Sequence, residues 1–501
     1  MRNPLEAITV AVAAGVAALA GSYAAAGLTP AFVAAPISDV VVAATPDAVV
    51  TWSIQTLGDL GAQLGFLLAL ALTAGLFAVA SAAGAALADR FDVNPSPVVA
   101  LLSVAVGLAL TGALLSTLAA GAAAGLAVAV ANWRAGATGG SAGGSGAPAG
   151  DGRGRNTRRR VLQALAGAVG IAGAGAVLGS RRNDDSNAAP ETDGEVDEEV
   201  RTLLDEADGK SLGVEGIEPL VSEQFYQVDI NNVDPNVARE DWTLSLTGAV
   251  DRPIEFDYDD LTGMTDSIER RFVTLRCVGE GLNGKKMDTA LWTGVPVMDL
   301  LDEANLNADE NCCVMFRAED DFFEEFPLSA LRDGFLAFEM NGEPLPRGHG
   351  HPVRALIPGH WGEINVKWLT EIEILEEEAD GYWEQRGWHG TGPVETVAKL
   401  HTVNHLDGGE IQVGGHAYAG TRGIERVEVS TDGGDSWTET TLSEPLPGTD
   451  VWRQWEYTYE ADSSHEVVVR ATDGEGELQP EEERNAFPSG PTGWVSRRVE
   501  P

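Results

Sequence analysis

The sequence predicts a chain of three parts: N-terminal transmembrane α-helices, then an α+β domain, then a C-terminal all-β sandwich. Residues 1–182 are built from long Ala-, Gly-, Val- and Leu-rich runs, which are typical of membrane helices. Over residues 203–395, short strand-like runs alternate with amphipathic helical patches, a mixture typical of an α+β domain. Over residues 396–501, alternating strand patterns recur at regular spacing with Asp-Gly turns between them, as in an antiparallel sandwich.

Residues 1–133 are predicted to form a multi-span membrane anchor. Residues 8–28 and 64–88 each approach or exceed the roughly 20 apolar residues that cross a bilayer. Residues 97–133 are too long for one span and predict a tight hairpin of two short ones. Residues 31–51 contain two prolines and two aspartates, so we expect an interfacial loop on the outer side rather than another span.

The linker and the last span fix the predicted topology. Residues 134–160 form a Gly/Ser-rich and then basic linker, and residues 161–180 a last transmembrane helix, which gives about five crossings. The arginines at the span ends belong in the cytoplasm by the positive-inside rule, so the acidic tether of residues 181–202 and everything after it are expected outside. The string TRRRVLQ equally fits an internal twin-arginine export signal or a simple charge anchor.

Charge separates the two halves of the chain. The net charge of the whole chain is −43, and residues 183–501 hold 69 acidic against 23 basic side chains. Such an excess of acid repels phosphate and excludes a nucleic-acid partner. It fits a protein that works in concentrated salt, and thus a halophilic source, with an ordinary acidic enzyme as the alternative.

The string RFVTLRCVGEG places Cys277 where an apolar strand-like run gives way to glycines. With three cysteines and no CxxC, a disulfide framework and a zinc or thioredoxin-type site are excluded. Adjacent Cys312 and Cys313 are expected in a buried strand. Cationic side chains flank Cys277, and positive charge favours the thiolate, the form that binds metal. From the residues alone, a structural cysteine is the default interpretation.

Three longer strings carry a family resemblance. RFVTLRCVGEGLNGKKMDTALWTGVPVMDLLDEA, FEMNGEPLPRGHGHPVRALIPGHWGEINVKWLTEIEI and YWEQRGWHGTGP resemble, in order and spacing, the molybdopterin-binding catalytic domain of the sulfite oxidase family. The sandwich that follows resembles that family's C-terminal immunoglobulin-like domain. The resemblance covers about residues 218–499 and extends into the membrane region only for a membrane-anchored subgroup. It implies a catalytic domain at residues 203–395, a molybdenum cofactor and an oxidoreductase activity.

The resemblance also implies roles for individual residues. Cys277 is implied as the thiolate ligand of molybdenum, and Trp292 is expected to pack beneath the metal loop. Glu280 departs from the more basic stretch of typical sulfite oxidases and would repel sulfite if it pointed inward. Residues implied to contact the cofactor or its phosphate, besides Cys277, are Tyr226, His349, Arg354, Asn365, Val366 and Lys367. Residues implied to contact the substrate are Lys285, Arg386 and Trp388.

The implied function is oxygen-atom transfer at a sulfur centre, with two electrons passed to a separate copper or haem protein. No histidine occurs in residues 1–182 and no CxxCH motif exists, so no haem is expected in this chain. The same cofactor could instead reduce a sulfoxide such as methionine sulfoxide, whose neutral charge tolerates Glu280. A non-enzymatic surface interaction protein is the third alternative. A homodimer through the C-terminal domain is a further expectation.

Overall fold

The computed structural model describes residues 4–132, 152–187, 197–306 and 312–501, which form two compact units. The first unit comprises residues 1–46, 57–188 and 229–236, and the second the remaining chain. The Gly/Ser-rich part of the predicted linker and residues 188–196 of the acidic tether lie outside the described residues.

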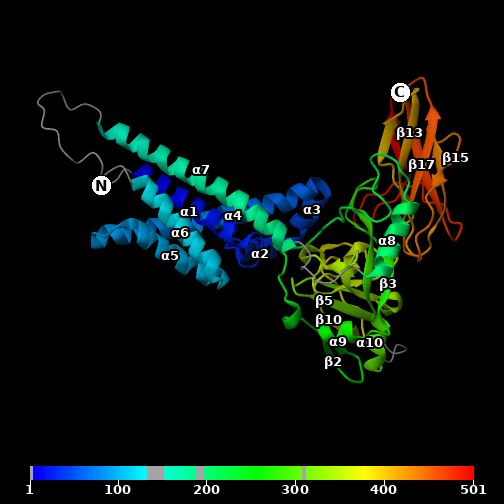
Figure 1. Cartoon of the computed structure of the whole chain (residues 1–501), viewed down its shortest axis with the longest axis horizontal. Coiled ribbons are helices and arrows are strands. Elements are labelled where there is room, and N and C mark those ends of the chain that lie inside the picture. The colour runs from blue at the N-terminus through cyan, green and yellow to red at the C-terminus, as the bar shows by residue number, and fades with distance from the viewer. Residues whose placement is uncertain (1–3, 133–151, 188–196, 307–311) are drawn as a thin grey trace, which may run out of the picture. The chain divides into compact units, whose positions relative to one another are not determined.

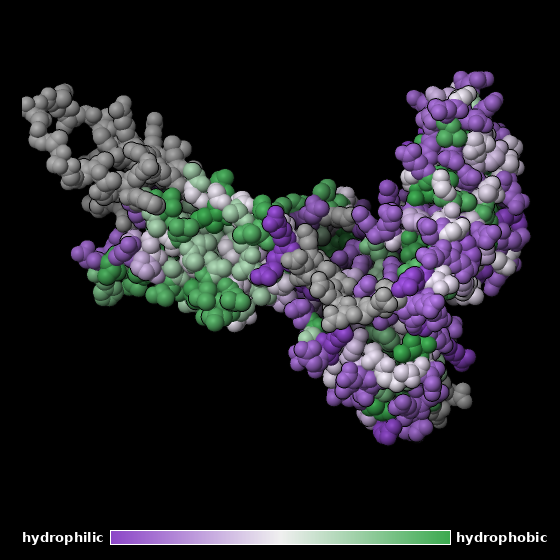
Figure 2. Space-filling view, viewed as in Figure 1, coloured by the Kyte–Doolittle hydropathy of each residue, from purple (hydrophilic) through white to green (hydrophobic). Residues whose placement is uncertain are grey.

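Apolar helices make up the first unit (Figure 1). Among the described residues, three helices are long and apolar enough to cross a membrane, Pro4–Ala26, Leu60–Phe91 and Leu114–Asn132, or four if the bent pair Ala35–Ala44 and Asp47–Leu57 forms one span. In the hydropathy view, hydrophobic side chains gather over these helices, whereas the surface of the second unit is mostly hydrophilic (Figure 2). The helices of the N-terminal 187 residues are α1 (Pro4–Ala26), α2 (Ala35–Ala44), α3 (Asp47–Leu57), α4 (Asp59–Phe91), α5 (Pro95–Thr111), α6 (Leu114–Asn132) and α7 (Gly152–Asn187).

The hairpin expected of residues 97–133 is present as α5 and α6. The chain reverses at Gly112, whose φ of +66° is a left-handed conformation that glycine adopts without strain. The helices approach closely, because a Cβ at Gly121 of α6 would lie 2.6 Å from the carbonyl oxygen of Ala100 in α5. Small residues that let backbones approach are the usual basis of helix packing in lipid.

The irregular backbone expected at residues 31–51 is wrong, because residues 35–44 and 47–51 are helical. They form α2 and the start of α3, which meet at an angle of 101°. Pro36 lies in the first turn of α2, where its missing N–H would have no intrahelical partner anyway, and Pro46 directly precedes α3. The prolines therefore begin helices here instead of preventing them.

The α+β part of the second unit contains two five-stranded sheets. The first has the order β2-β1-β10-β5-β6, with β1 parallel to β10 and the other pairs antiparallel. Its strands are β1 (Thr243–Gly248), β2 (Ile254–Asp257), β5 (Cys313–Ala318), β6 (Phe323–Pro327) and β10 (Leu369–Leu375). The second sheet has the order β3-β4-β7-β8 with β9 beside β7. Its strands are β3 (Glu269–Arg276), β4 (Met287–Pro296), β7 (Phe335–Met340), β8 (Glu343–Pro344) and β9 (Arg354–Leu356).

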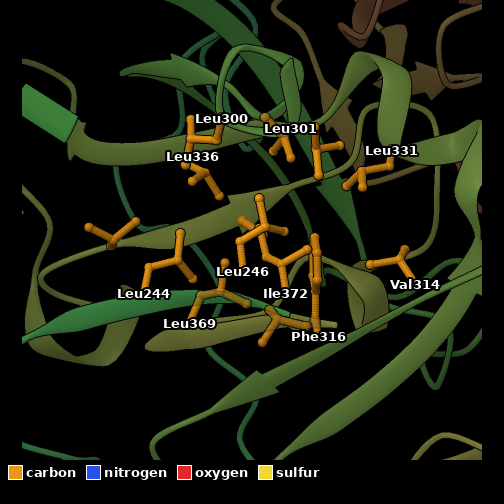
Figure 3. Close-up of a cluster of buried hydrophobic side chains, with 14 of the residues drawn as sticks. Leu244, Leu246, Leu300, Leu301, Val314, Phe316, Leu331, Leu336, Leu369 and Ile372 are labelled. Atoms are coloured by element: carbon orange, nitrogen blue, oxygen red, sulfur yellow. The ribbon is translucent and has the colours of Figure 1, made fainter. Parts of the chain in front are cut away.

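One apolar core joins the first sheet to the helices beside it (Figure 3). Leu246, Phe316 and Ile372 come from neighbouring strands and are at most 1% exposed. Leu300 of α10 and Leu336 of β7 close the core from the other side. The remaining helices are α8 (Glu198–Lys210), α9 (Tyr258–Gly263) and α10 (Val297–Glu303), with short 3₁₀ helices η2 (Arg239–Asp241), η3 (Leu328–Asp333), η4 (Arg347–His349), η5 (Gly362–Ile364) and η6 (Glu384–Arg386).

Strands β11 to β19 form two sheets that share one core, and we call them the C-terminal sandwich. One sheet has the order β11-β13-β17-β16 with β12 beside β13, and the other has the order β15-β14-β18-β19. Val413 and Trp455 from the first sheet and Val427 and Val469 from the second are all at most 1% exposed and pack together. The strands are β11 (Val397–Ala398), β12 (Thr402–His405), β13 (Glu410–Tyr418), β14 (Ile424–Ser430), β15 (Thr438–Glu439), β16 (Thr441–Leu442), β17 (Arg453–Glu460), β18 (His465–Asp473) and β19 (Val495–Val499).

Only one of the two adjacent cysteines lies in a buried strand, where both were expected. Cys313 begins β5 and is buried, but Cys312 is exposed just before the strand. The two form a disulfide with each other, which leaves Cys277 as the free cysteine of the chain.

Candidate active site

Cys277 opens a ten-residue loop between two buried strands. The last five residues of β3 are buried, and the next strand, β4, begins at Met287. The amide of Cys277 donates a hydrogen bond to the carbonyl oxygen of Lys286 at 3.0 Å, which closes residues 277–286 into what we call the Cys277 loop. Cys277 as a whole residue is partly exposed. Its side chain is therefore held at the end of a rigid strand.

The charges around the thiol do not act as the sequence suggests. Burial and the Glu280 carboxylate raise the pKa of Cys277 to about 11, and Lys286 only partly offsets them. Sequence reasoning expected cationic neighbours to prevail, but it could not see how deeply the loop is buried or that Glu280 lies inside it. A coordinated metal ion removes the proton of a thiol outright, so the raised pKa describes the metal-free chain.

Two of the predicted substrate contacts, Lys285 and Trp388, differ in their surroundings. Lys285 is exposed, whereas its neighbour Lys286 exerts a charge effect on Cys277. The Trp388 ring and the thiol both lie close to Gly279, since a Cβ at Gly279 would be 3.8 Å from the ring and 3.9 Å from Sγ of Cys277. Sequence reasoning had chosen Lys285 from proximity in the sequence alone.

Arg386 lies in η6 and is held by its neighbours. Its guanidinium stacks 3.6 Å from the centroid of the Tyr382 ring and donates to the Tyr382 carbonyl oxygen at 2.6 Å. Its Nε also lies 3.3 Å from a carboxylate oxygen of Asp47 in α3. Arg386 is thus fixed in place, in the same segment as Trp388.

A buried cluster of three charged residues supports the Cys277 loop. Glu280 points inward and is 6% exposed, while Arg276 and Lys399 are fully buried. Nζ of Lys399 binds Oε1 of Glu280, and Nε of Arg276 lies 4.0 Å from the same oxygen. Burial lowers the pKa of Lys399 to about 8 and that of Arg276 to about 10, with Glu280 opposing both shifts. Sequence reasoning missed Lys399, which is distant in sequence and has no motif around it.

Three of the predicted cofactor contacts converge on η4. Arg354 donates from Nη1 to the carbonyl oxygen of His349 at 3.3 Å, and Lys367 donates from Nζ to that of Gly348 at 2.9 Å. Burial, with these two cations, lowers the pKa of His349 to about 3, so its imidazole is neutral. A guanidinium fork and an ammonium beside a neutral imidazole are suited to a phosphate group.

Asn365 and Val366 hold the backbone of this site through their own packing. The Asn365 side chain accepts from the amide of Ile357 at 2.7 Å and donates to the carbonyl oxygen of Trp361 at 3.0 Å. Val366 is 1% exposed in the main core, and its carbonyl oxygen accepts from Ala355 at 2.8 Å. In this structure both residues shape the loop from within.

Tyr226 is within reach of charges from both the Cys277 loop and Arg354. Burial raises the pKa of its phenol well above the ordinary value, and the charges of Cys277 and Glu280 add to the shift while Arg354 opposes it. The amide of Tyr226 donates to Asp288 at 2.7 Å, which fixes the segment against β4. Trp292 is fully buried and makes an edge contact with Phe225 at 5.5 Å, in agreement with its predicted packing role.

Sequence reasoning also missed a group of buried glutamates near the loop. Glu363 lies in η5 against Gly390, and burial, with the nearby Glu384 carboxylate, raises the pKa of Glu363 to about 8. Glu324 is fully buried, and burial and Glu384 raise its pKa to about 11. These side chains carry protons at neutral pH, and so they do not make the site negative.

The donors around Cys277 fit an anionic, metal-bearing group. Within the described chain, the buried Nε1 of Trp388 and Nη2 of Arg276 have no hydrogen-bond partner. Buried donors without partners are rare in native proteins, and they are usually completed by an ordered water or a bound group. The described residues include no cluster of three or more His, Cys, Asp or Glu side chains arranged to hold a metal ion.

Comparison with known families agrees with this arrangement. Residues 231–383 match the family described as oxidoreductase molybdopterin binding domain, and residues 393–488 match the Mo-co oxidoreductase dimerisation domain. Cys277 and Arg354 fall in the first region and Lys399 in the second.

Two curated relatives and one solved structure are similar to the chain. The NADH nitrate reductase of Spinacia oleracea is 29% identical over 319 residues, which cover 49% of this chain and 34% of that protein. The mitochondrial sulfite oxidase of Mus musculus is 28% identical over 305 residues, which cover 50% of this chain and 55% of that protein. The chain thus spans less than two thirds of either relative. The crystal structure of the sulfane dehydrogenase SoxCD from Paracoccus pantotrophus matches with a TM-score of 0.47 and 20% identity, over 62% of this chain and 93% of that one.

Proposed function

We propose that this chain, a molybdenum-dependent oxidoreductase by its two matched domains, transfers an oxygen atom at a sulfur centre, with sulfite as substrate. The observation that carries the proposal is Cys277, a free cysteine at the end of β3, inside the matched molybdopterin-binding region. The similarity to a sulfite oxidase supports the choice of a sulfur substrate.

The chain's own residues would bind and orient the cofactor. Cys277 would hold the metal, because thiolate is a soft anionic ligand, and Arg354, Lys367 and His349 would hold the phosphate end of the pterin. When bound, the molybdenum cofactor supplies two-electron oxygen-atom transfer. Sulfite and water then give sulfate, two protons and two electrons.

Positive charge beside Cys277 would attract and orient the sulfur oxyanion. The buried cluster of Arg276, Glu280 and Lys399 has two cations and one carboxylate, so it carries one net positive charge. Charges fixed in a buried site act more strongly than the same charges in water and need no rearrangement during the reaction. The expected repulsion by Glu280 is thereby offset, although Glu280 does point inward.

The N-terminal helices would anchor the enzyme in the cell membrane as a multi-pass protein, with the catalytic domain outside. Their apolar length and the arginines at the predicted span ends support this topology. The two electrons would pass to a separate small copper or haem protein. A homodimer would form through the C-terminal sandwich, as the name of its matched domain suggests.

Metal analysis and a substrate panel test the function. The full chain, purified in detergent, is expected to contain about one molybdenum per chain and to oxidise sulfite with ferricyanide as acceptor. Activity confined to methionine sulfoxide with reduced viologen would instead identify a sulfoxide reductase. A chain without molybdenum, purified from a host that makes the cofactor, would leave the non-enzymatic surface role.

A further inference from the structure

The C-terminal sandwich contributes a buried charge to the Cys277 loop. Lys399 directly follows β11 and is fully buried. Its backbone is held on both sides: its amide donates to the carbonyl oxygen of His416 at 2.8 Å, and its own carbonyl oxygen accepts from Nε1 of Trp455 at 3.0 Å. The ammonium is therefore presented from a rigid position between two sandwich strands.

Inside the Cys277 loop, that ammonium binds Glu280. Nζ of Lys399 contacts Oε1 of Glu280 and donates to the carbonyl oxygen of Gly284 at 2.8 Å. The second carboxylate oxygen, Oε2, accepts from the amide of Lys286 at 2.6 Å. A Cβ at Gly284 would lie 2.4 Å from Oε2, so a larger residue there would displace the carboxylate. Both oxygens of Glu280 are thus used within the loop.

A second contact fixes the loop to the same sandwich segment. The side-chain amide of Asn283 donates to the carbonyl oxygen of Leu400 at 2.8 Å, and its oxygen accepts from the amide of Leu400 at 2.8 Å. The loop that carries Cys277 is therefore ordered by residues 399 and 400 of the other matched domain.

The loss of Lys399 would remove the net positive charge of the cluster near the thiol. Removal of one partner of a buried ion pair leaves an uncompensated buried charge. Arg276, at 4.0 Å, would then face Glu280 alone, and the cluster would lose its net positive charge. The other charged or titratable groups that act on Cys277 or Tyr226, namely Lys286, Glu363, Asp288 and Arg354, would stay as they are.

We propose that Lys399 is a positioning residue for the Cys277 site: by binding Glu280 it keeps the loop in place and gives the site the positive potential that selects a negatively charged sulfur substrate. This inference rests on the proposed function only for its statement about substrate. The effect of Lys399 on the potential at the thiol does not depend on it.

Alkylation of the cofactor-free full chain measures that potential directly. Iodoacetate is anionic and iodoacetamide neutral, and both react with the thiolate, so the ratio of their rates at Cys277 cancels the ionised fraction of the thiol. Peptide mapping separates Cys277 from the other two cysteines. We expect K399M to lower the iodoacetate-to-iodoacetamide ratio roughly fivefold or more, E280Q to raise it, and the E280Q/K399M double variant to stay within about twofold of the parent chain.

Two further variants keep this test decisive. Arg470→Met breaks a partly exposed ion pair on the other sheet of the sandwich, in which Nε of Arg470 lies 3.0 Å from a carboxylate oxygen of Glu428. This variant should leave the iodoacetate-to-iodoacetamide ratio unchanged. Lys399→Arg should restore most of the ratio. If K399M does not fold, E280Q and the double variant give the same comparison. An unchanged ratio in E280Q and in the folded K399M chain would overturn the proposal.

Kinetics of the loaded enzyme test the substrate statement. We expect K399M to raise the KM for sulfite about fivefold or more, while the KM for a neutral sulfoxide changes less than twofold. Equal changes for both substrates would overturn the charge-selection role. If the alkylation ratios follow the expectation but sulfite is not turned over by the parent chain, the positioning role stands and the proposed function fails.

Discussion

The guanidinium of Arg354 lies 5.2 Å from the centre of the Trp292 ring. Trp292 comes from β4 and Arg354 from β9, and both strands pair with β7. The indole ring is fully buried and its Nε1 donates to the carbonyl oxygen of Val273 at 3.3 Å, so the ring cannot rotate. Trp292 was expected only to pack beneath the metal loop. It also orients Arg354, which is expected to bind the cofactor.

Arg354→Ala should lower cofactor occupancy at least tenfold. The change removes the fork that holds η4 and leaves buried carbonyl oxygens without donors, at a cost of about 1–3 kcal/mol in stability. Pterin fluorescence after release of the cofactor measures occupancy, and thermal unfolding measures stability. Arg317→Ala on β5, where the side chain is 43% exposed, is the control. Full occupancy in R354A would count against the predicted contact.

Cys277→Ser should keep the fold and lose sulfite oxidation by about a hundredfold or more. A serine hydroxyl is a much poorer ligand for a soft metal site than thiolate, whereas the volume change at a partly exposed position costs about 0.5 kcal/mol. Molybdenum content, turnover and circular dichroism together check this. Cys312→Ser, at an exposed position, breaks the disulfide with Cys313 outside the Cys277 loop and should keep its turnover. Unchanged activity in C277S would rule out the ligand role.

Glu363→Gln should become relatively more stable as pH rises. The folded pKa of Glu363 is raised to about 8 from an ordinary value near 4.5, so its contribution is fully present below about pH 4.5 and is lost as pH rises through about 8. Glutamine does not ionise and avoids that loss. Denaturant unfolding at pH 5 and pH 8 should show the advantage of E363Q growing by about 3 kcal/mol. A constant difference between the two pH values would contradict the assignment.

Phe316→Ala should destabilise the α+β core by about 4 kcal/mol. Phe316 is fully buried, and its ring meets that of Phe326 edge-on at 4.9 Å. Denaturant unfolding followed by tryptophan fluorescence measures the loss. Phe323→Ala on the neighbouring strand β6, where the ring is partly exposed, should cost about 1 kcal/mol or less. Equal losses would mean that the core can collapse around the cavity.

Protease added to intact cells should release the acidic C-terminal part of the chain. The prediction follows from the proposed topology, in which the arginines at the span ends remain in the cytoplasm. An antibody to the C-terminus should detect a soluble fragment in the medium, while a cytoplasmic marker stays intact. Complete protection of the C-terminus until the cells are lysed would place the catalytic domain inside.

The sequence by itself determined the parts of the chain and their chemistry. Apolar length predicted the N-terminal helices and the hairpin of α5 and α6, and strand alternation predicted the sandwich, because both patterns are local properties of the chain. The strings around Cys277 and Arg354 predicted a molybdopterin site through their resemblance to the sulfite oxidase family. Residues 31–51 were misjudged, since a proline can begin a helix as well as end one.

Only the tertiary structure decided the charge at Cys277. Glu280 reads in the sequence as a repulsive acid and Lys399 as an unremarkable lysine of another domain. They bind each other because the fold brings β11 against the Cys277 loop. The pKa of a buried group depends on desolvation and on which charges surround it in space. Neither quantity follows from neighbours in sequence, so Lys399 and Glu363 could be recognised as part of the site only once the chain was folded.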